Sequence, residues 1–112
     1  MKTYSAQTGF AYRYRYLGHR PFRAGGDGGV EFVFGVSSGS RECVPVAVRV
    51  SGAALRAWEE ERSRQLSSTE QYAIAKMALF QAFEERPTPA RMGDDIAVRH
   101  ADLRAILETL DL

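Results

Sequence analysis

The spacing of the hydrophobic residues changes once along this chain, close to Ser51. Before that point, three runs place hydrophobic residues at every second position, as strands with one buried face do, and they cover residues 9–17, 30–36 and 44–50. After it, hydrophobic residues recur at helical spacing. A chain that has its strands first and its helices second is typical of an α+β fold. We therefore expect an antiparallel three-stranded meander with helices packed against one of its faces.

Capping signals divide the helical half of the chain. Ser51 is a good N-cap residue for the first helix, and Ser67 with Glu70 has the spacing of a capping box at the start of the second, which ends before Pro87. Helices are predicted over residues 52–66, 69–85 and 101–110, and one further short strand over residues 96–98. We therefore expect a single α+β domain over residues 1–112, with the last strand and helix added to the C-terminal side of the meander.

The composition is that of a folded, soluble domain. At 112 residues, with 45% hydrophobic and 26% charged residues, the chain is long enough to bury a core of its own. The single cysteine, Cys43, excludes an internal disulfide, and we expect it to be structural. Neither a membrane span nor a secretory signal is recognisable after Met1. We expect a cytoplasmic protein with no cofactor and no membrane partner.

The segment from Phe10 to Tyr16 alternates aromatic residues with Arg13 and Arg15. On an extended strand, all its aromatic rings face one side and both guanidinium groups face the other. Exposed rings would be typical of a surface that stacks nucleic-acid bases, whereas buried rings are typical of a half-buried strand. Because burying the rings gains far more free energy than burying the arginines, we expect the rings in the core or at its rim and the arginines on the open side of the sheet.

Basic residues are concentrated near the N-terminus. The first 26 residues carry five basic side chains and no acidic one, whereas the remaining residues carry a net charge of −4. One predicted function is therefore weak, sequence-independent binding of nucleic acid through phosphate contacts on the open side of the sheet. The residues predicted to make these contacts are Arg13, Arg15, Arg20, Arg23 and Arg49.

The helix predicted over residues 69–85 is hydrophobic on almost every side. Such a helix has to be covered on almost every side, and in a small domain a second copy of the chain can supply part of the cover. We therefore predict a homodimer whose interface includes Ile74, Met77 and Phe80. The leading functional hypothesis is a non-catalytic binding or assembly module that homodimerises and has a protein as a further partner.

Catalytic residues are not recognisable in this sequence. Cys43 has no histidine or asparagine at the spacing of a known cysteine nucleophile, so we assign no catalytic residue and regard an enzyme as the less favoured class. One alternative is a small metal-dependent enzyme, because Asp94, Asp95 and His100 are close enough in sequence to ligate a divalent ion. Each of the two acids also has a simpler interpretation as a loop residue.

The connection between the first two predicted strands, residues 18–29, is rich in glycine. It lacks the Gly-Lys-Ser/Thr ending of a phosphate-binding loop, and it leads into a strand instead of a helix. We therefore expect a long hairpin connection that is either mobile or functional. A connection of this length would also allow another element to lie between the two strands.

Overall fold

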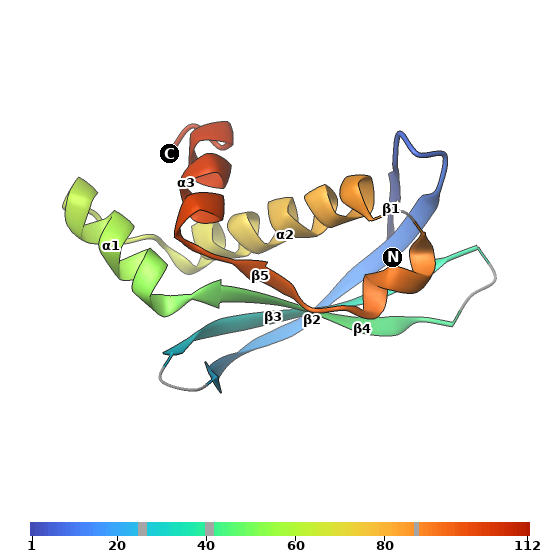
Figure 1. Cartoon of the computed structure of the whole chain (residues 1–112), viewed down its shortest axis with the longest axis horizontal. Helices are drawn as coiled ribbons and strands as arrows, with labels where there is room; N and C mark the ends of the chain where they lie inside the picture. Colours follow the sequence, from blue (N-terminus) through green and yellow to red (C-terminus); the bar gives the residue numbers. More distant parts are fainter. Residues whose placement is uncertain (25–26, 40–41, 87) are drawn as a thin grey trace.

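The computed structural model describes residues 1–24, 27–39, 42–86 and 88–112 of the chain. In them, five strands form one sheet in the order β1-β2-β3-β4-β5: β1 (Lys2–Ser5), β2 (Ala11–Ala24), β3 (Asp27–Ser38), β4 (Val44–Ser51) and β5 (Ile96–Val98). The helices are α1 (Gly52–Arg62), α2 (Ser68–Glu85), the short 3-10 helix η1 (Pro89–Gly93) and α3 (His100–Thr109). The three α-helices lie on one side of the sheet (Figure 1), and the predicted α+β fold is confirmed.

The predicted meander forms the centre of a larger sheet. Strands β2, β3 and β4 pair antiparallel in chain order, and β1 adds antiparallel to β2. The C-terminal strand is no separate addition, because β5 pairs in parallel with β4 in the same sheet. β1 was not predicted, since its hydrophobic residues do not alternate, and it is held by Tyr4, whose ring stacks on Phe80 at 4.7 Å and whose hydroxyl donates to Glu84.

The prediction of a long connection over residues 18–29 is wrong. β2 and β3 continue as paired strands to Ala24 and Asp27, so no element separates them, and Gly25 and Gly26 lie outside the described residues. The register shifts between Tyr16 and Gly18, where a β-bulge interrupts the ladder. Gly18 has a φ of +138°, which residues with a Cβ rarely adopt, so a glycine that resembled a loop signal is instead required by the bulge.

The hydrophobic core lies between the sheet and the helices. Tyr12 and Tyr14 are 0% and 5% exposed, so their rings are inside as predicted, whereas Tyr16 at 39% lies at the rim. The ring of Tyr12 stacks on Phe83 of α2, with 4.4 Å between centroids. The strands contribute alternate residues to this core, namely Phe32, Phe34, Val36, Val46, Val48, Val50, Ile96 and Val98. In the part of the chain that the structure describes, no helix lies on the other side of the sheet (Figure 1).

The covering of α2 comes from its own chain. The sheet lies on one side of the helix, α3 and β5 pack against another, and Tyr4 and Tyr14 contact Phe80. Ile74 is 0% exposed inside this core, so the structure leaves it no surface for a second copy. Met77 and Phe80 are half-buried. Of the three residues predicted for a dimer surface on α2, only Met77 and Phe80 are thus left. The sequence alone could not show that α3 and β5 cover the helix.

Candidate functional site

The candidate site is the side of the sheet that faces away from the helices, here called the open face. Strand register fixes its members, because residues paired across neighbouring strands point to the same side. On β2, Arg13 pairs with Ser37, Arg15 with Gly35 and Arg20 with Glu31 of β3. Gly35 and Glu31 pair in turn with Pro45 and Arg49 of β4. Polar and hydrophobic residues share this face, the largest being Arg13, Arg15, Leu17, Arg20, Phe22, Glu31, Val33, Pro45 and Arg49.

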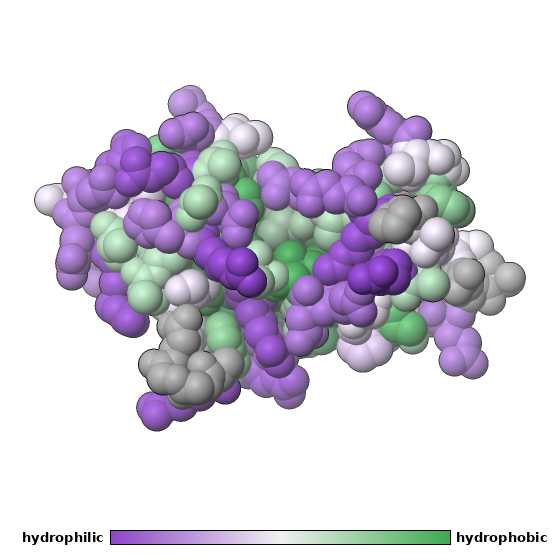
Figure 2. Space-filling model, in the orientation of Figure 1, coloured by the Kyte–Doolittle hydropathy of each residue, from purple (hydrophilic) through white to green (hydrophobic). Residues whose placement is uncertain are grey.

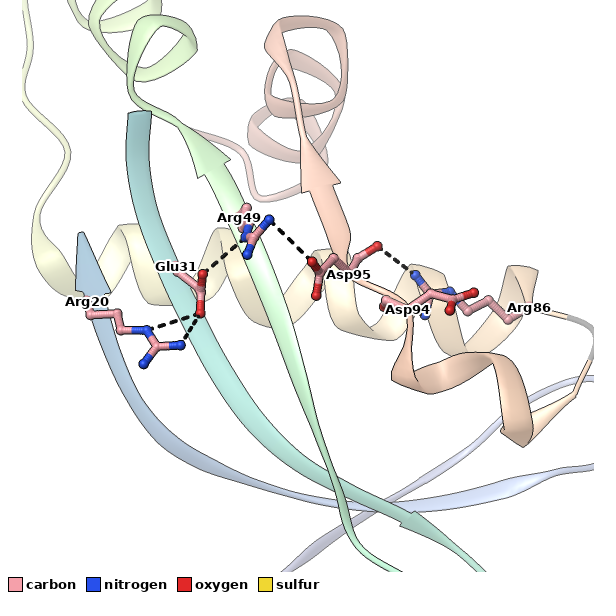
Figure 3. Close-up of polar contacts among 6 residues, drawn as sticks. All are labelled: Arg20, Glu31, Arg49, Arg86, Asp94 and Asp95. Carbon is pink, nitrogen blue, oxygen red and sulfur yellow. Dashed lines mark hydrogen bonds and ion pairs between the residues drawn. The ribbon is translucent and has the colours of Figure 1, made fainter. Parts of the chain in front are cut away.

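A row of ion pairs crosses the open face (Figure 3). Arg20 Nη2 lies 2.9 Å from Glu31 Oε1, and Arg49 Nε lies 3.1 Å from Glu31 Oε2. Arg49 also reaches Asp95, directly before the first residue of β5, with 3.3 Å between Nη1 and Oδ2. Among the described residues, Glu31 is the one charged side chain classed as buried, and its neighbours across both ladders are arginines.

Electrostatics keep Glu31 ionised. Burial raises the pKa of its carboxyl group, but the hydrogen bonds and positive charges of Arg20 and Arg49 outweigh burial, so the pKa lies below its ordinary value. The guanidinium of Arg49 also lies 5.5 Å from the centre of the Phe22 ring. Two arginines and two acids therefore compensate one another, and the row adds no net charge to the surface.

The remaining predicted arginines differ from this pair. Arg13 and Arg15 are exposed on the open face, and neither belongs to an ion pair among the described residues. Arg23 is also exposed, but it lies on the opposite side of β2 from Arg20, because the two are three positions apart on the strand. Four of the five predicted arginines thus lie on the open face, namely Arg13, Arg15, Arg20 and Arg49. Of these four, only Arg13 and Arg15 have no ion pair among the described residues.

A hydrophobic patch lies between these arginines and the ion-pair row. Its members are Leu17, which is 51% exposed, together with Val33, Pro45 and Ala47, and we call it the open-face patch. Gly35 lies beneath it, where an added Cβ would come within 3.6 Å of the Leu17 side chain. Leu17 is the residue at the bulge, which explains why sequence alternation alone did not place it on this face.

The proposed metal ligands are not brought together. Asp94 pairs with Arg91 at 2.9 Å and Asp95 with Arg49, while His100 begins α3. Arg86 holds the turn in place, because its guanidinium donates to main-chain carbonyls that include Asp94 and Asp95 (Figure 3). Within residues 1–24, 27–39, 42–86 and 88–112, no group of three or more His, Cys, Asp or Glu side chains has a metal-binding arrangement.

A hollow of about 250 Å³ lies between α2, β5 and α3. Figure 2 shows it near the centre of the molecule, with hydrophobic residues at its bottom and hydrophilic ones around it. Ile96 and Ile106 belong to its lining, and Glu85, Arg86 and Asp102 supply charged groups. Asp102 accepts the N–H of Arg99 at the start of α3, and Arg86 is bound to carbonyls. Asp102 and Arg86 therefore stabilise the fold, and the described lining residues include no serine, threonine, cysteine or histidine.

Comparison with known proteins does not assign this fold and site to a family. No protein-family model matches the chain, and no curated protein and no solved structure matches it significantly. In the described part of the chain, none of the helices combines the length and the hydrophobicity needed to cross a membrane. The fold and the site define a small α+β domain with one uncovered sheet face, and its function has to be argued from the geometry of that face.

Proposed function

We propose that this chain is a non-catalytic binding and assembly module that forms a homodimer through its open face. The observation that carries the proposal is the open-face patch, in which Leu17 is half exposed beside Val33, Pro45 and Ala47. Protein interfaces have a hydrophobic centre and a polar rim in which arginine is common. The open-face patch has this organisation, because Arg13 and Arg15 lie on one side of it and the ion-pair row lies on the other.

Charge complementarity favours a second copy as the partner. Arg15 pairs with Gly35, which pairs with Pro45 on the next strand, whereas Asp95 precedes Ile96 at the far edge of the sheet. A line from Arg15 to Asp95 therefore crosses the patch. A two-fold axis through the patch and perpendicular to that line places Arg15 of each copy opposite Asp95 of the other. The Asp95 side chain is 55% exposed, so it is accessible to a second cation.

Sedimentation equilibrium over a concentration series tests the dimer. We expect a dimer at about 100 µM protein and a monomer for Leu17→Glu, since a charge in the centre of the patch is not compensated. Ala105→Glu, at an exposed position of α3, is the matched control and should leave the dimer intact. Arg15→Glu should weaken the dimer, and adding Asp95→Arg should restore it, because the swap reverses both charges of the pair.

Two outcomes contradict this proposal. A wild-type protein that stays monomeric at that concentration has no stable open-face interface. A dimer that resists Leu17→Glu but is broken by Met77→Glu uses the exposed part of α2, as first predicted from the sequence. Circular dichroism of each variant, compared with the wild type, establishes that the fold is intact before its mass is interpreted.

We propose weak nucleic-acid binding as a second candidate function, on a separate observation. Arg13 and Arg15 are exposed and have no ion pair among the described residues, and Thr3 and Ser37 flank Arg13 on the same face. Guanidinium and hydroxyl groups in a row are donors that suit phosphate oxygens. Two uncompensated arginines make few phosphate contacts, so we expect weak binding with little dependence on sequence.

A salt series with fluorescent single-stranded and double-stranded oligonucleotides tests this second function. With two phosphate contacts on duplex DNA, the slope of log K against log salt should be about −1.8. The double variant Arg13→Glu with Arg15→Glu should abolish binding, while Arg56→Glu with Arg62→Glu, at exposed positions of α1, should not. Binding that is absent, or that survives the first double variant, contradicts the nucleic-acid hypothesis without affecting the dimer.

A further inference from the structure

Strand β2 has an outer edge that is only partly covered. β1 pairs with it from Ala11 to Tyr14, and beyond Tyr14 no other described strand pairs with β2 on that side. The main-chain N–H and C=O groups on an uncovered edge can form hydrogen bonds with another extended chain. The edge from Arg15 to Ala24 therefore offers main-chain donors and acceptors beyond those that bind β3.

A pocket of about 370 Å³ opens beside this edge, on the helix side of the sheet. Its walls include the rings of Tyr16, His19, Phe32 and Tyr72, and Thr69 at the start of α2 lies at its rim. Tyr16 and Tyr72 contact edge to face at 4.8 Å, and the Tyr16 hydroxyl is 2.8 Å from His19 Nδ1. These contacts fix the rings in place, so the pocket is already formed in the free protein.

We propose that this edge and pocket bind an extended, acidic peptide segment of another protein. The segment adds its main chain to β2 near His19, and one large hydrophobic or aromatic side chain enters the pocket. This is the recognition mode in which main-chain hydrogen bonds supply affinity and a side-chain pocket supplies specificity. The aromatic walls of the pocket match an aromatic or aliphatic side chain better than a polar one.

The charge of the edge favours an acidic segment. Residues 15–24 include Arg15, Arg20 and Arg23 and no acidic residue. Arg20 is paired with Glu31, while Arg15 and Arg23 have no ion pair in the described part of the chain. Aspartate or glutamate residues on either side of the inserted side chain would lie close to these two arginines. A second copy of β2 would instead place arginines against arginines.

Two features limit the length of the added strand. The bulge between Tyr16 and Gly18 interrupts the regular spacing of main-chain groups, and Pro21 has no N–H to donate. Regular pairing is therefore confined to a few residues around His19 and Arg20, directly beside the pocket. A short contact of this kind depends on the inserted side chain for much of its affinity, and it protects the edge from pairing with long strands.

A display library of random nine-residue peptides tests the proposal with the whole chain as bait. We expect enriched peptides that combine one aromatic or large aliphatic residue with flanking acids. Thr69→Trp, which fills the mouth of the pocket from an exposed position, should weaken a synthetic copy of an enriched peptide at least tenfold, as loss of an anchor residue does. Gln81→Trp, exposed on the same helix away from the pocket, should leave binding unchanged.

Hydrogen exchange distinguishes strand addition from binding to the pocket alone. Successive N–H groups of a strand point to opposite edges, so only one of the His19 and Arg20 amides faces the uncovered edge. That amide should exchange more slowly when the peptide is bound, and Arg23→Glu should weaken binding of the acidic peptides. The proposal is overturned if no peptide is enriched, or if enriched peptides bind Thr69→Trp as well as wild type. It is also overturned if Thr69→Trp breaks a dimer, because the occupant is then a second copy. Because the pocket lies on the opposite side of the sheet from the open-face patch, these results do not depend on the Leu17→Glu experiment.

Discussion

The hydroxyl group of Tyr12 provides the sharpest test of the described core. Tyr12 is 0% exposed, and its ring stacks on Phe83 at 4.4 Å. No described residue forms a hydrogen bond with its hydroxyl oxygen, although the group is shut off from solvent. Burial raises the pKa of this phenol more than the positive charge of Arg86 lowers it, so the group is protonated and neutral near pH 7. We expect Tyr12→Phe to stabilise the protein.

The magnitude follows from the cost of an unbonded polar group. A buried hydroxyl without a partner costs about 1–3 kcal/mol of desolvation, and Tyr12→Phe removes that cost while it keeps the ring and its stacking on Phe83. The small gap left by one oxygen atom offsets part of the gain. The free energy of unfolding should therefore rise by about 1 kcal/mol.

Urea unfolding followed by circular dichroism measures this change, with the slope m unchanged between variants. Two tyrosines supply matched controls. Tyr14→Phe removes a hydroxyl that, unlike that of Tyr12, is not both buried and unbonded, and it should change stability by less than about 0.5 kcal/mol. Tyr4→Phe removes the hydrogen bond to Glu84 and should destabilise the protein. A Tyr12→Phe protein that is less stable by about 1 kcal/mol or more would refute the reasoning, since its hydroxyl would then have a partner.

Three further predictions concern the ion-pair row, the β3–β4 contact and the start of α2. Glu31→Gln should lower the free energy of unfolding by about 2 kcal/mol in urea, because it leaves two arginines without their carboxylate. The pKa of Glu31 is depressed in the folded state, so its contribution to stability is complete above its unfolded pKa of about 4.3 and is lost as the pH falls through the folded value. The difference in unfolding free energy between wild type and Glu31→Gln should therefore shrink in acid. A constant difference from pH 7 to pH 3 would contradict this. Gly29→Ala should cost about 1–3 kcal/mol by thermal unfolding, since its Cβ would lie 2.0 Å from the Val50 carbonyl oxygen, and an unchanged melting temperature would contradict that close approach. Ser67→Ala should cost about 1 kcal/mol in the same assay and reduce helicity, because Ser67 accepts the N–H of Glu70 in the capping box, and full retention of both would contradict the cap.

Hydrophobic periodicity and helix-capping signals predicted most of the fold. The alternation on β2, β3 and β4 placed most of the core residues correctly, because one face of an antiparallel sheet is buried and the other is not. Tyr16 and Val44, on the same face, are exposed at its rim. The capping box at Ser67 located the start of α2 to within one residue, and both of its hydrogen bonds are present. β1 was missed because a short polar strand carries no periodic signal. Its position is set by the long-range contacts of Tyr4.

The β2–β3 hairpin shows why loop signals misled the prediction. Gly18 and Pro21 are typical of connections, and both lie within β2. An edge strand tolerates a proline, because the missing N–H need not break a ladder, and a bulge requires a glycine at Gly18. Sequence spacing does not reveal which strand lies at an edge, because that depends on how far β1 extends along β2.

The open face was predicted in part. The alternation around Arg13 and Arg15 placed both side chains on it correctly. The role of Glu31 was missed, because its partners Arg20 and Arg49 come from two other strands and meet it only through the register of two hairpins. A glutamate in the middle of a hydrophobic strand was the available signal. It indicates a buried acid, and a buried acid in a stable fold requires a cationic partner.

The parallel pairing of β5 with β4 determines the order in which the sheet can be completed. The hairpins β2–β3 and β3–β4 close over short distances along the chain, whereas β5 reaches β4 only after both α1 and α2 have been passed. Contacts between distant segments form late because their loop-closure entropy is larger. Until residues 96–98 are in place, the outer edge of β4 is open from Val48 to Val50, so newly made chains have a period in which two unfinished sheets can join edge to edge. The time that α1 and α2 need to dock thus sets how long each nascent molecule is exposed to misassembly.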